Sequence, residues 1–494
     1  MASPDAMSID SRTPVLVGAG AVSQRIEDAT AAREPIELMI EALARAADDA
    51  GTREILTRAD TVRVPKGFPP YPDPGRLIAE RVGANAKTEL LEIGILQTTA
   101  FGRSAAAIAA GEEEVALVVG GEGKFRALRA QIAGVEPEYT DQGDAVPDVV
   151  VKPHDEIMSE PELIHGLAMP VNQYALIDNA MRFAEGKSLD EHVREIAELW
   201  AEMSRVAAGN PDAWIREVLS PDDIATADAK NRMLAFPYTK RHTSQWNVDQ
   251  AAGLILCSVG VARELGIAQD RWLFPRAVAD ANHMVPLCER VELHRSHGFR
   301  VAGRHAFEIA GVTAQDVRHR ELYSCFPAAV RAQIRELELD PKLPVTVTGG
   351  MAFAGGPLNN FVLQATAKMA HVLRAAPGDV GLVTAVSGLL TKQGVSLWST
   401  EPGERPFEFV DVSSEVEGEL TRVECLGDYT GAATIASATV LYEPTGARAA
   451  FLCDTPDGKR TIASTADESI AQRTAETEVI GRRLDLAPGH VAFS

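Results

Sequence analysis

A glycine-rich turn that leads into a helix is the most distinctive chemical feature of this sequence. TGGMAFAGGPLNNF covers residues 348–361, follows a strand-like run at 343–349, and precedes a helix expected from about Pro357 to Ala376. Unpaired amides and the helix dipole favour negative charge at a helix N-terminus. The turn therefore predicts either a phosphate-binding loop or an active-site turn.

Two reactive side chains lie in a second motif, ELYSCF at residues 321–326, which is expected to be a strand before the helix that Pro327 opens. A cysteine at such a place can have a lowered pKa, although we favour a buried structural thiol for Cys325. The phenol of Tyr323 could act as an acid or base if its pKa were lowered. A buried tyrosine with a satisfied hydroxyl is the alternative.

A third segment, VLVGAGAVS, places Gly18 and Gly20 after a strand in the manner of a dinucleotide-binding fingerprint. The third glycine position is Ser23, and no acidic ribose ligand follows. We therefore favour a plain tight turn.

Composition excludes several classes of protein. The chain has 494 residues, with 48 basic and 70 acidic side chains and a formal net charge of −22, which argues against a nucleic-acid partner. Its five cysteines are odd in number and form no CxxC pair, so we expect no metal site and a reduced, cytoplasmic protein. No signal peptide and no membrane span is expected from the apolar pattern.

The order of elements predicts an α/β protein, because strands alternate with helices over most of the chain. We assign residues 1–122 and 246–270 to a first half, 271–400 to a second half, and 123–245 to an inserted loop domain. Residues 405–494 change character and predict a small all-β unit, for which a five-stranded oligonucleotide/oligosaccharide-binding (OB) barrel is our interpretation.

Two finer expectations concern these parts. Gly94 and Gly356 each open a helix that ends in a short turn and a VxLV strand, which suggests one half-domain used twice. The insertion holds one amphipathic helix, capped by Ser188 and closed by Gly209, and is expected to lie over one face of the first sheet.

Several blocks together resemble the thiolase superfamily across residues 14–400. GEEEVALVVGGE matches the thiolase run that ends in a glycine pair and a glutamate. ELYSCF stands where thiolases carry Asn-Glu-Ala-Phe or His-Asp-Cys-Phe, and GGPLN stands where they carry Gly-His-Pro-Leu-Gly. VNQYALIDNAMRFAEG and NPDAW resemble the thiolase-like branch with an extra C-terminal domain. The resemblance implies two similar βαβαβ halves that form a layered αβαβα core.

The same resemblance implies that the catalytic side chains are missing. A thiolase needs a thiolate nucleophile at a helix N-terminus, and that position falls at about Gly94. The histidine that binds the thioester oxygen becomes Gly356, the polar residue of the third motif becomes Tyr323, and the second cysteine becomes Val386 or Ser387. No cysteine lies between Met1 and Leu256, so thiolysis and Claisen condensation by the thiolase route are not expected.

The resemblance further implies a coenzyme A (CoA) thioester as substrate or ligand and no covalently bound cofactor. The substrate-binding residues would be Gly94, Tyr323, Ser324, Cys325, Phe326, Gly355, Gly356, Pro357, Ser387 and Gly388. Basic residues flank the region that holds the nucleotide end of CoA in thiolases, and the candidates for phosphate contacts are Lys124, Arg126, Arg129, Lys240 and Arg241. A solvated face is the alternative for both clusters.

Three functions follow as hypotheses. The first is an acyl-CoA-binding, thiolase-like protein that similarity would name acetyl-CoA acetyltransferase, in fatty-acid or sterol side-chain metabolism. The second is a carbon–carbon lyase on a 3-hydroxyacyl-CoA, in which Tyr323 takes the hydroxyl proton and the C-terminal unit replaces an OB-fold partner. The third is a non-catalytic carrier or scaffold whose β-unit docks a protein.

The association state is expected to be a monomer or a homodimer. Thiolases commonly pair through an edge strand of the first half, here TELLEI at residues 88–93, and an appended domain could cover that edge.

Overall fold

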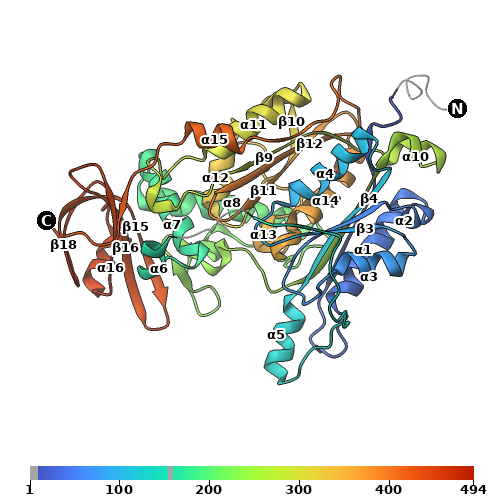
Figure 1. Ribbon diagram of the computed structural model, residues 1–494. Coiled ribbons are helices and arrows are strands. Elements are labelled where there is room, and N and C mark those ends of the chain that lie inside the picture. Colours follow the sequence, from blue (N-terminus) through green and yellow to red (C-terminus); the bar gives the residue numbers. More distant parts are fainter. Residues whose placement is uncertain (1–8, 154–158) are drawn as a thin grey trace.

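The computed structural model describes residues 9–153 and 159–494. Two neighbouring α/β sheets form the body of the molecule, and a β-rich C-terminal unit lies at one end, in red in Figure 1.

The first sheet has the strand order β1-β8-β4-β2-β3-β5. β8 runs antiparallel to both β1 and β4, whereas β4, β2, β3 and β5 run parallel to one another. Its strands are β1 (Pro14–Gln24), β2 (Thr61–Pro65), β3 (Lys87–Leu91), β4 (Val115–Gly123), β5 (Val149–Val151) and β8 (Asp249–Ser258).

The second sheet repeats this pattern with the order β10-β11-β12-β9-β13. In this sheet β9 and β12 pair antiparallel, β12 and β11 pair antiparallel, and β11 and β10 pair parallel. The pairs β1–β8, β8–β4 and β4–β2 of the first sheet have the same directions in the same order. Its strands are β9 (Phe274–Asn282), β10 (Val317–Glu321), β11 (Val380–Ser387), β12 (Lys392–Ser399) and β13 (Phe409–Asp411). The proposed repeat of one half-domain is therefore present, with β4 and β11 as equivalent strands.

Helices complete a five-layered αβαβα core, as the thiolase resemblance predicts. α1 (Pro35–Ala50) and α3 (Pro74–Val82) cover the outer face of the first sheet. α4 (Gln97–Ala110) and α14 (Phe361–Ala375) contact each other and strands of both sheets, so they form the middle layer. α11 (His297–Ala310) covers the second sheet through β9 and β12.

Shorter helices connect these layers. They are α2 (Glu54–Thr57), α5 (Lys124–Ala133), α6 (Glu160–Ile164), α9 (Pro221–Ala225), α10 (Val259–Glu264), α12 (Pro327–Glu336), α13 (Gly350–Phe353) and α15 (Ser413–Glu419).

We expected the inserted region to lie over one face of the first sheet, but its two long helices pack elsewhere. Its long helices are α7 (Pro170–Ala184), which packs on α12 and β15, and α8 (Leu189–Ala208), which packs on α9 and α13. The amphipathic pattern of α8 explains this position, because its buried face presents Ile196, Trp200 and Met203 to the second half. The capping box of Ser188 and Glu191 starts this helix where the sequence predicts.

The C-terminal unit is β-rich but differs from the expected five-stranded, all-β barrel. Its sheet has eight strands, two of which come from the inserted region, and helix α16 (Glu468–Glu476) packs on β15 and β16. These strands are β6 (Met233–Ala235), β7 (Tyr238–Thr239), β14 (Cys425–Leu426), β15 (Gly431–Glu443), β16 (Gly446–Asp454), β17 (Arg460–Thr465), β18 (Arg483–Ala487) and β19 (His490–Phe493). β13 pairs with β9, so the first strand after residue 405 is part of the second sheet.

The edge strand through which thiolases pair is covered within this chain. β5 pairs with β3 from Glu89 to Leu91, so this strand covers the edge for which the sequence suggested the C-terminal unit as one possible cover. A short strand of the inserted region therefore occupies the hydrogen-bonding groups that a partner subunit would use.

A buried ion pair joins the inserted region to the second half. Asp178 of α7 is fully buried, pairs with Arg331 of α12, and accepts a hydrogen bond of 2.7 Å from the Tyr238 hydroxyl. Although burial acts in the opposite direction, the charges of His192 and Arg331 hold the pKa of Asp178 below its usual range.

Replacing Arg331 by alanine is expected to lower the free energy of unfolding by about 3–5 kcal/mol, because a buried carboxylate is left unpaired. Chemical denaturation followed by circular dichroism measures this. The matched control is Arg205→Ala, which breaks an exposed pair with Glu202 on α8 and should cost less than about 1 kcal/mol. Equal losses in the two variants would contradict the role assigned to Arg331.

Candidate active site

The glycine-rich turn is held in place by one carboxylate, Glu321, at the end of β10. Glu321 is fully buried and accepts hydrogen bonds of 2.8 Å from the backbone amides of Val347 and Thr348. The hydroxyls of Thr346 and Thr348 donate to it at 2.9 and 3.0 Å. Burial raises its pKa to about 7, against the effect of these donors. The predicted strand at 343–349 is absent, because its amides bind this side chain instead of a neighbouring strand.

Two short helical segments of the glycine-rich turn lie before the long helix α14. α13 and a 3₁₀ turn at Leu358–Asn360 precede α14, so the long helix begins at Phe361 and not near Pro357.

The four residues after Leu322 line the region beneath this turn, and all four are buried. The Tyr323 amide donates to Thr384 Oγ1 at 2.8 Å, and its ring meets Phe361 edge to face at 5.9 Å. Ser324 Oγ accepts from the Met351 amide at 2.9 Å, which ties the motif to α13. Phe326 stacks on Tyr174 with a centroid separation of 4.5 Å.

Both titratable groups of this motif are protonated at neutral pH. Burial raises the pKa of the Tyr323 phenol, which is the opposite of the shift that a base would need. Burial also raises the pKa of the Cys325 thiol to about 12, which favours a structural thiol over a nucleophile.

The position of the thiolase histidine is filled by another side chain. A Cβ atom added at Gly356 would lie 1.9 Å from Ser244 Oγ, and one at Gly355 would lie 2.2 Å from Gln250 Oε1. The Gly356 amide donates to the Gln245 carbonyl at 2.8 Å. This amide is therefore already engaged within the chain and is not free to polarise a thioester carbonyl. Pro357 is buried beside it.

The position of the thiolase nucleophile lies beside a buried lysine. Gly94 has a left-handed backbone with φ 102°, and its carbonyl accepts a 2.8 Å hydrogen bond from Lys392 Nζ. A Cβ atom added at Gly94 would lie 3.5 Å from this ammonium group and 3.4 Å from Pro153. An amine thus stands next to the place of the lost thiol.

The residues at the expected position of the second thiolase cysteine also make contacts within the chain. Val386 is buried at the end of β11, and Ser387 pairs with Lys392 across the β11–β12 ladder. The Gly388 carbonyl accepts from the Tyr174 hydroxyl at 3.3 Å, which connects this turn to α7.

A cleft of about 530 Å³ opens at the carboxyl ends of β2 and β4. It begins at Trp246, one residue after Gln245, and Phe68 forms part of its wall. Lys124 places its ammonium group between these two rings, 3.6 Å from the centroid of Trp246 and 4.2 Å from that of Phe68. Both rings are about half exposed, at 48% and 53%. The volume falls in the range of small-molecule sites, roughly 300–1,000 Å³.

A buried acid completes this cleft. Glu122 is 2% exposed, and one of its oxygens accepts from the Phe68 amide at 3.1 Å. The other, Oε2, has no hydrogen-bond partner among the described residues. Burial raises the pKa of Glu122 to about 7.

The other basic candidates lie outside this cleft. Arg126 is buried and donates to the carbonyls of Ala32 and Glu138, so it is not available to a phosphate. Arg129 pairs with Glu27 at 3.0 Å.

The second basic cluster is equally separate. Lys240 is exposed on the 3₁₀ turn at Lys240–His242, and Arg241 donates to the Asp223 carbonyl at 2.6 Å. Of the five predicted phosphate contacts, the structure places Lys124 in the cleft.

Sequence reasoning missed Glu321, Ser244, Trp246 and Lys392. Only Glu321 had a usable signal, as an acidic residue within a strand-like run. The contacts of the other three depend on segments that are far apart in the sequence. Two further findings concern the described residues: no group of histidine, cysteine, aspartate or glutamate could hold a metal ion, and no helix is long and apolar enough to cross a membrane.

Comparison with known proteins identifies the family to which this chain is similar. No protein-family model matches the chain. A monomeric SCP2-thiolase-like protein, type 1, from Mycobacterium smegmatis superposes with a TM-score of 0.82 and 29% identity over 98% of this chain and 100% of that one. This chain belongs to the thiolase superfamily.

Other similar proteins extend the comparison. An acetyl-CoA acetyltransferase from Methanothermobacter thermautotrophicus is 25% identical over 175 residues, which are 31% of this chain and 45% of that protein. The match thus spans less than half the length of this curated relative. The dimeric peroxisomal thiolase of Saccharomyces cerevisiae shares the fold, with a TM-score of 0.55 and 14% identity over 81% of this chain and 100% of the other. The Ltp2-ChsH2(DUF35) aldolase also shares the fold, with a TM-score of 0.61 and 19% identity over 80% of this chain and 99% of the other.

In this thiolase-superfamily chain, Gly356→Ala is expected to destabilise the fold by about 1–3 kcal/mol, because the new methyl group overlaps Ser244 Oγ. Adding Ser244→Gly should restore most of the loss, as measured by chemical denaturation. The control Gly209→Ala, which meets its nearest atom at 3.6 Å, should stay within about 0.5 kcal/mol. Failure of the double variant to recover would show that the packing argument is wrong.

Proposed function

We propose that this chain binds CoA thioesters at the thiolase site without carrying out the thiolase reaction. One observation carries the proposal: a cleft lined by aromatic rings and a lysine includes Trp246, whose neighbour Gln245 is hydrogen-bonded to the glycine-rich turn. Trp246 and Phe68 offer stacking surfaces for an adenine ring, and Lys124 offers a positive charge for a phosphate.

In this proposal Lys392 replaces the thiolase histidine as the group that binds the thioester oxygen. Its ammonium group lies 3.5 Å from the position of a Gly94 Cβ, close to where a thiolase holds the thioester sulfur and carbonyl. A cation there stabilises negative charge on a thioester oxygen. The link to fatty-acid or sterol side-chain metabolism is part of the same proposal.

A carbon–carbon lyase acting on a 3-hydroxyacyl-CoA is the second candidate, and Lys392 is the observation that favours it. In such a cleavage the hydroxyl loses its proton, the C2–C3 bond breaks, and the electron pair enters a thioester enolate that a cation would stabilise. One of the structural neighbours is named an aldolase. Tyr323 would have to receive the proton as a phenolate, and its burial opposes that form, so this candidate ranks second.

A calorimetric titration tests the binding function with acetyl-, acetoacetyl-, long-chain and sterol-side-chain acyl-CoA. We expect micromolar binding, roughly −8 kcal/mol, to at least one thioester. Trp246→Ala should weaken it by about 1–3 kcal/mol through lost stacking. The control Phe183→Ala removes an exposed ring of α7 and should leave affinity unchanged. Absence of binding to every thioester would leave a scaffold role as the function.

Product analysis by mass spectrometry tests the chemistry. We expect no thiolysis of acetoacetyl-CoA and no condensation of acetyl-CoA, because Cys325, the only thiol among the described residues of the site, is protonated. Thiolysis that survives in a Cys325→Ser variant would refute the assignment of the missing nucleophile. Cleavage of a 3-hydroxyacyl-CoA that disappears in Tyr323→Phe, with binding unchanged, would make the lyase the function.

A further inference from the structure

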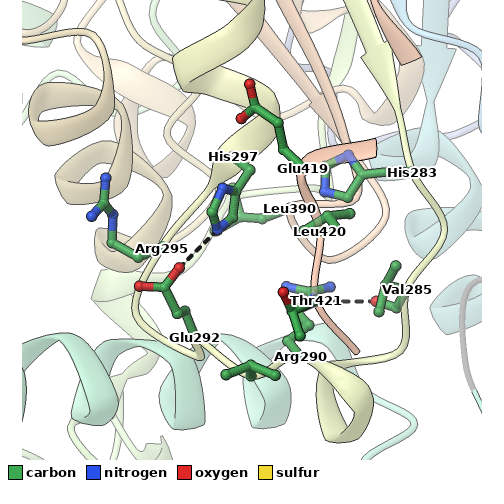
Figure 2. A pocket seen from close by; sticks show the side chains of 11 residues that line it. His283, Val285, Arg290, Glu292, Arg295, His297, Leu390, Glu419, Leu420 and Thr421 are labelled. Atoms are coloured by element: carbon green, nitrogen blue, oxygen red, sulfur yellow. Dashed lines mark hydrogen bonds and ion pairs between the residues drawn. The ribbon is translucent and has the colours of Figure 1, made fainter. Parts of the chain in front are cut away.

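A second cavity, of about 180 Å³, lies where the second half meets the segment before the C-terminal unit (Figure 2). Its wall comes from the chain after β9, the loop before α11, the β11–β12 turn at Leu390, and residues 419–421. None of the residues that line it belongs to the candidate active site.

Most charges around this cavity already have partners within the chain. The ion pairs are Glu292 with His297 at 3.0 Å, Glu419 with Arg300 at 2.7 Å, and Arg295 with Glu336 at 2.7 Å. A ligand therefore has little to gain from these carboxylates and cations.

Arg290 is different, because its charge has no carboxylate partner among the described residues. It is 8% exposed, and it donates to two neutral carbonyls, Val285 at 3.1 Å and Leu389 at 2.7 Å. The nearest compensating charge is the buried Glu162, whose own oxygens accept from the backbone amides of Cys288 and Ser159. A buried guanidinium without a paired anion is costly, so an anion that reaches it would be stabilised.

A second polar side chain points into the same space. His283 is 6% exposed, and Figure 2 shows its ring directed into the cavity from the opposite wall to Arg290. Its Nδ1 has no hydrogen-bond partner among the described residues. Burial lowers the pKa of His283 to about 3, so the ring is neutral and can donate one hydrogen bond.

The remaining wall is apolar. Leu390 and Leu420 approach the cavity from the side above Arg290 in Figure 2, and Val285 lies beside the guanidinium. The space thus combines one cation that has no ion-pair partner among the described residues, one neutral donor and an aliphatic surface.

We propose that this cavity binds a short-chain carboxylate anion, with Arg290 donating to the carboxylate and Leu390 and Leu420 covering the alkyl group. A phosphate fits less well, because its additional oxygens would face the leucines without donors. The site is connected to the candidate active site, since Arg290 holds the Leu389 carbonyl in the turn that follows Ser387 and Gly388.

Titration of the full chain with sodium butyrate, at constant ionic strength in chloride, tests this site by saturation-transfer nuclear magnetic resonance. We expect saturable binding that Arg290→Gln weakens about tenfold or more, because a charge-assisted hydrogen bond is lost. Leu420→Trp should also abolish binding by filling the cavity, while it leaves every hydrogen bond of Arg290 in place. This second variant separates loss of the site from a folding defect, which thermal unfolding monitors.

The control is Arg318→Gln, which removes an exposed guanidinium that forms no ion pair among the described residues and should bind butyrate as the wild type does. The proposal is overturned if the wild type does not bind butyrate, or if Arg290→Gln and Leu420→Trp both bind it normally. Inorganic phosphate that binds as tightly and is blocked by the same two variants would overturn the carboxylate class.

Discussion

The buried carboxylate of Glu321 is the interaction on which the rest of the site depends. It accepts hydrogen bonds from two backbone amides and two hydroxyls of the segment Thr346–Thr348, and it closes β10 two residues before Tyr323. One side chain therefore sets the relative position of the two motifs that form a thiolase site. Both oxygens of this buried acid accept hydrogen bonds from the segment, so its amides are used by the carboxyl group and not by a neighbouring strand.

Around that anchor, the chain has rebuilt the thiolase centre with structural contacts. Ser244 fills the space of the histidine, Gln245 accepts the amide of Gly356, and Phe326 is stacked against Tyr174. These contacts engage the groups around the glycine-rich turn within the chain. The ammonium of Lys392 is the charged group placed next to the former nucleophile position.

The inserted region and the C-terminal unit change what the core can contact. β5 occupies the free edge of β3, and α7 lies between α12 and β15 with Asp178 paired to Arg331. The region that holds the nucleotide in thiolases is thus committed to internal contacts, and the open cleft lies instead at Trp246 and Lys124. This rearrangement explains why Arg126 and Arg241 are bound to backbone carbonyls.

The sequence by itself determined the fold class and the repeated half-domain, and it predicts the loss of the thiolase side chains. These follow from local patterns: apolar strands, glycine and proline at helix ends, and the residue types at motif positions such as Gly94 and Gly356. The tertiary structure alone decided which groups meet. The stretch at 343–349 has a strand-like composition, yet its amides bind Glu321, because hydrogen-bond satisfaction in the folded chain outweighs local propensity. Lys392 reaches Gly94 across a sequence separation of 298 residues, and no local pattern encodes such a contact.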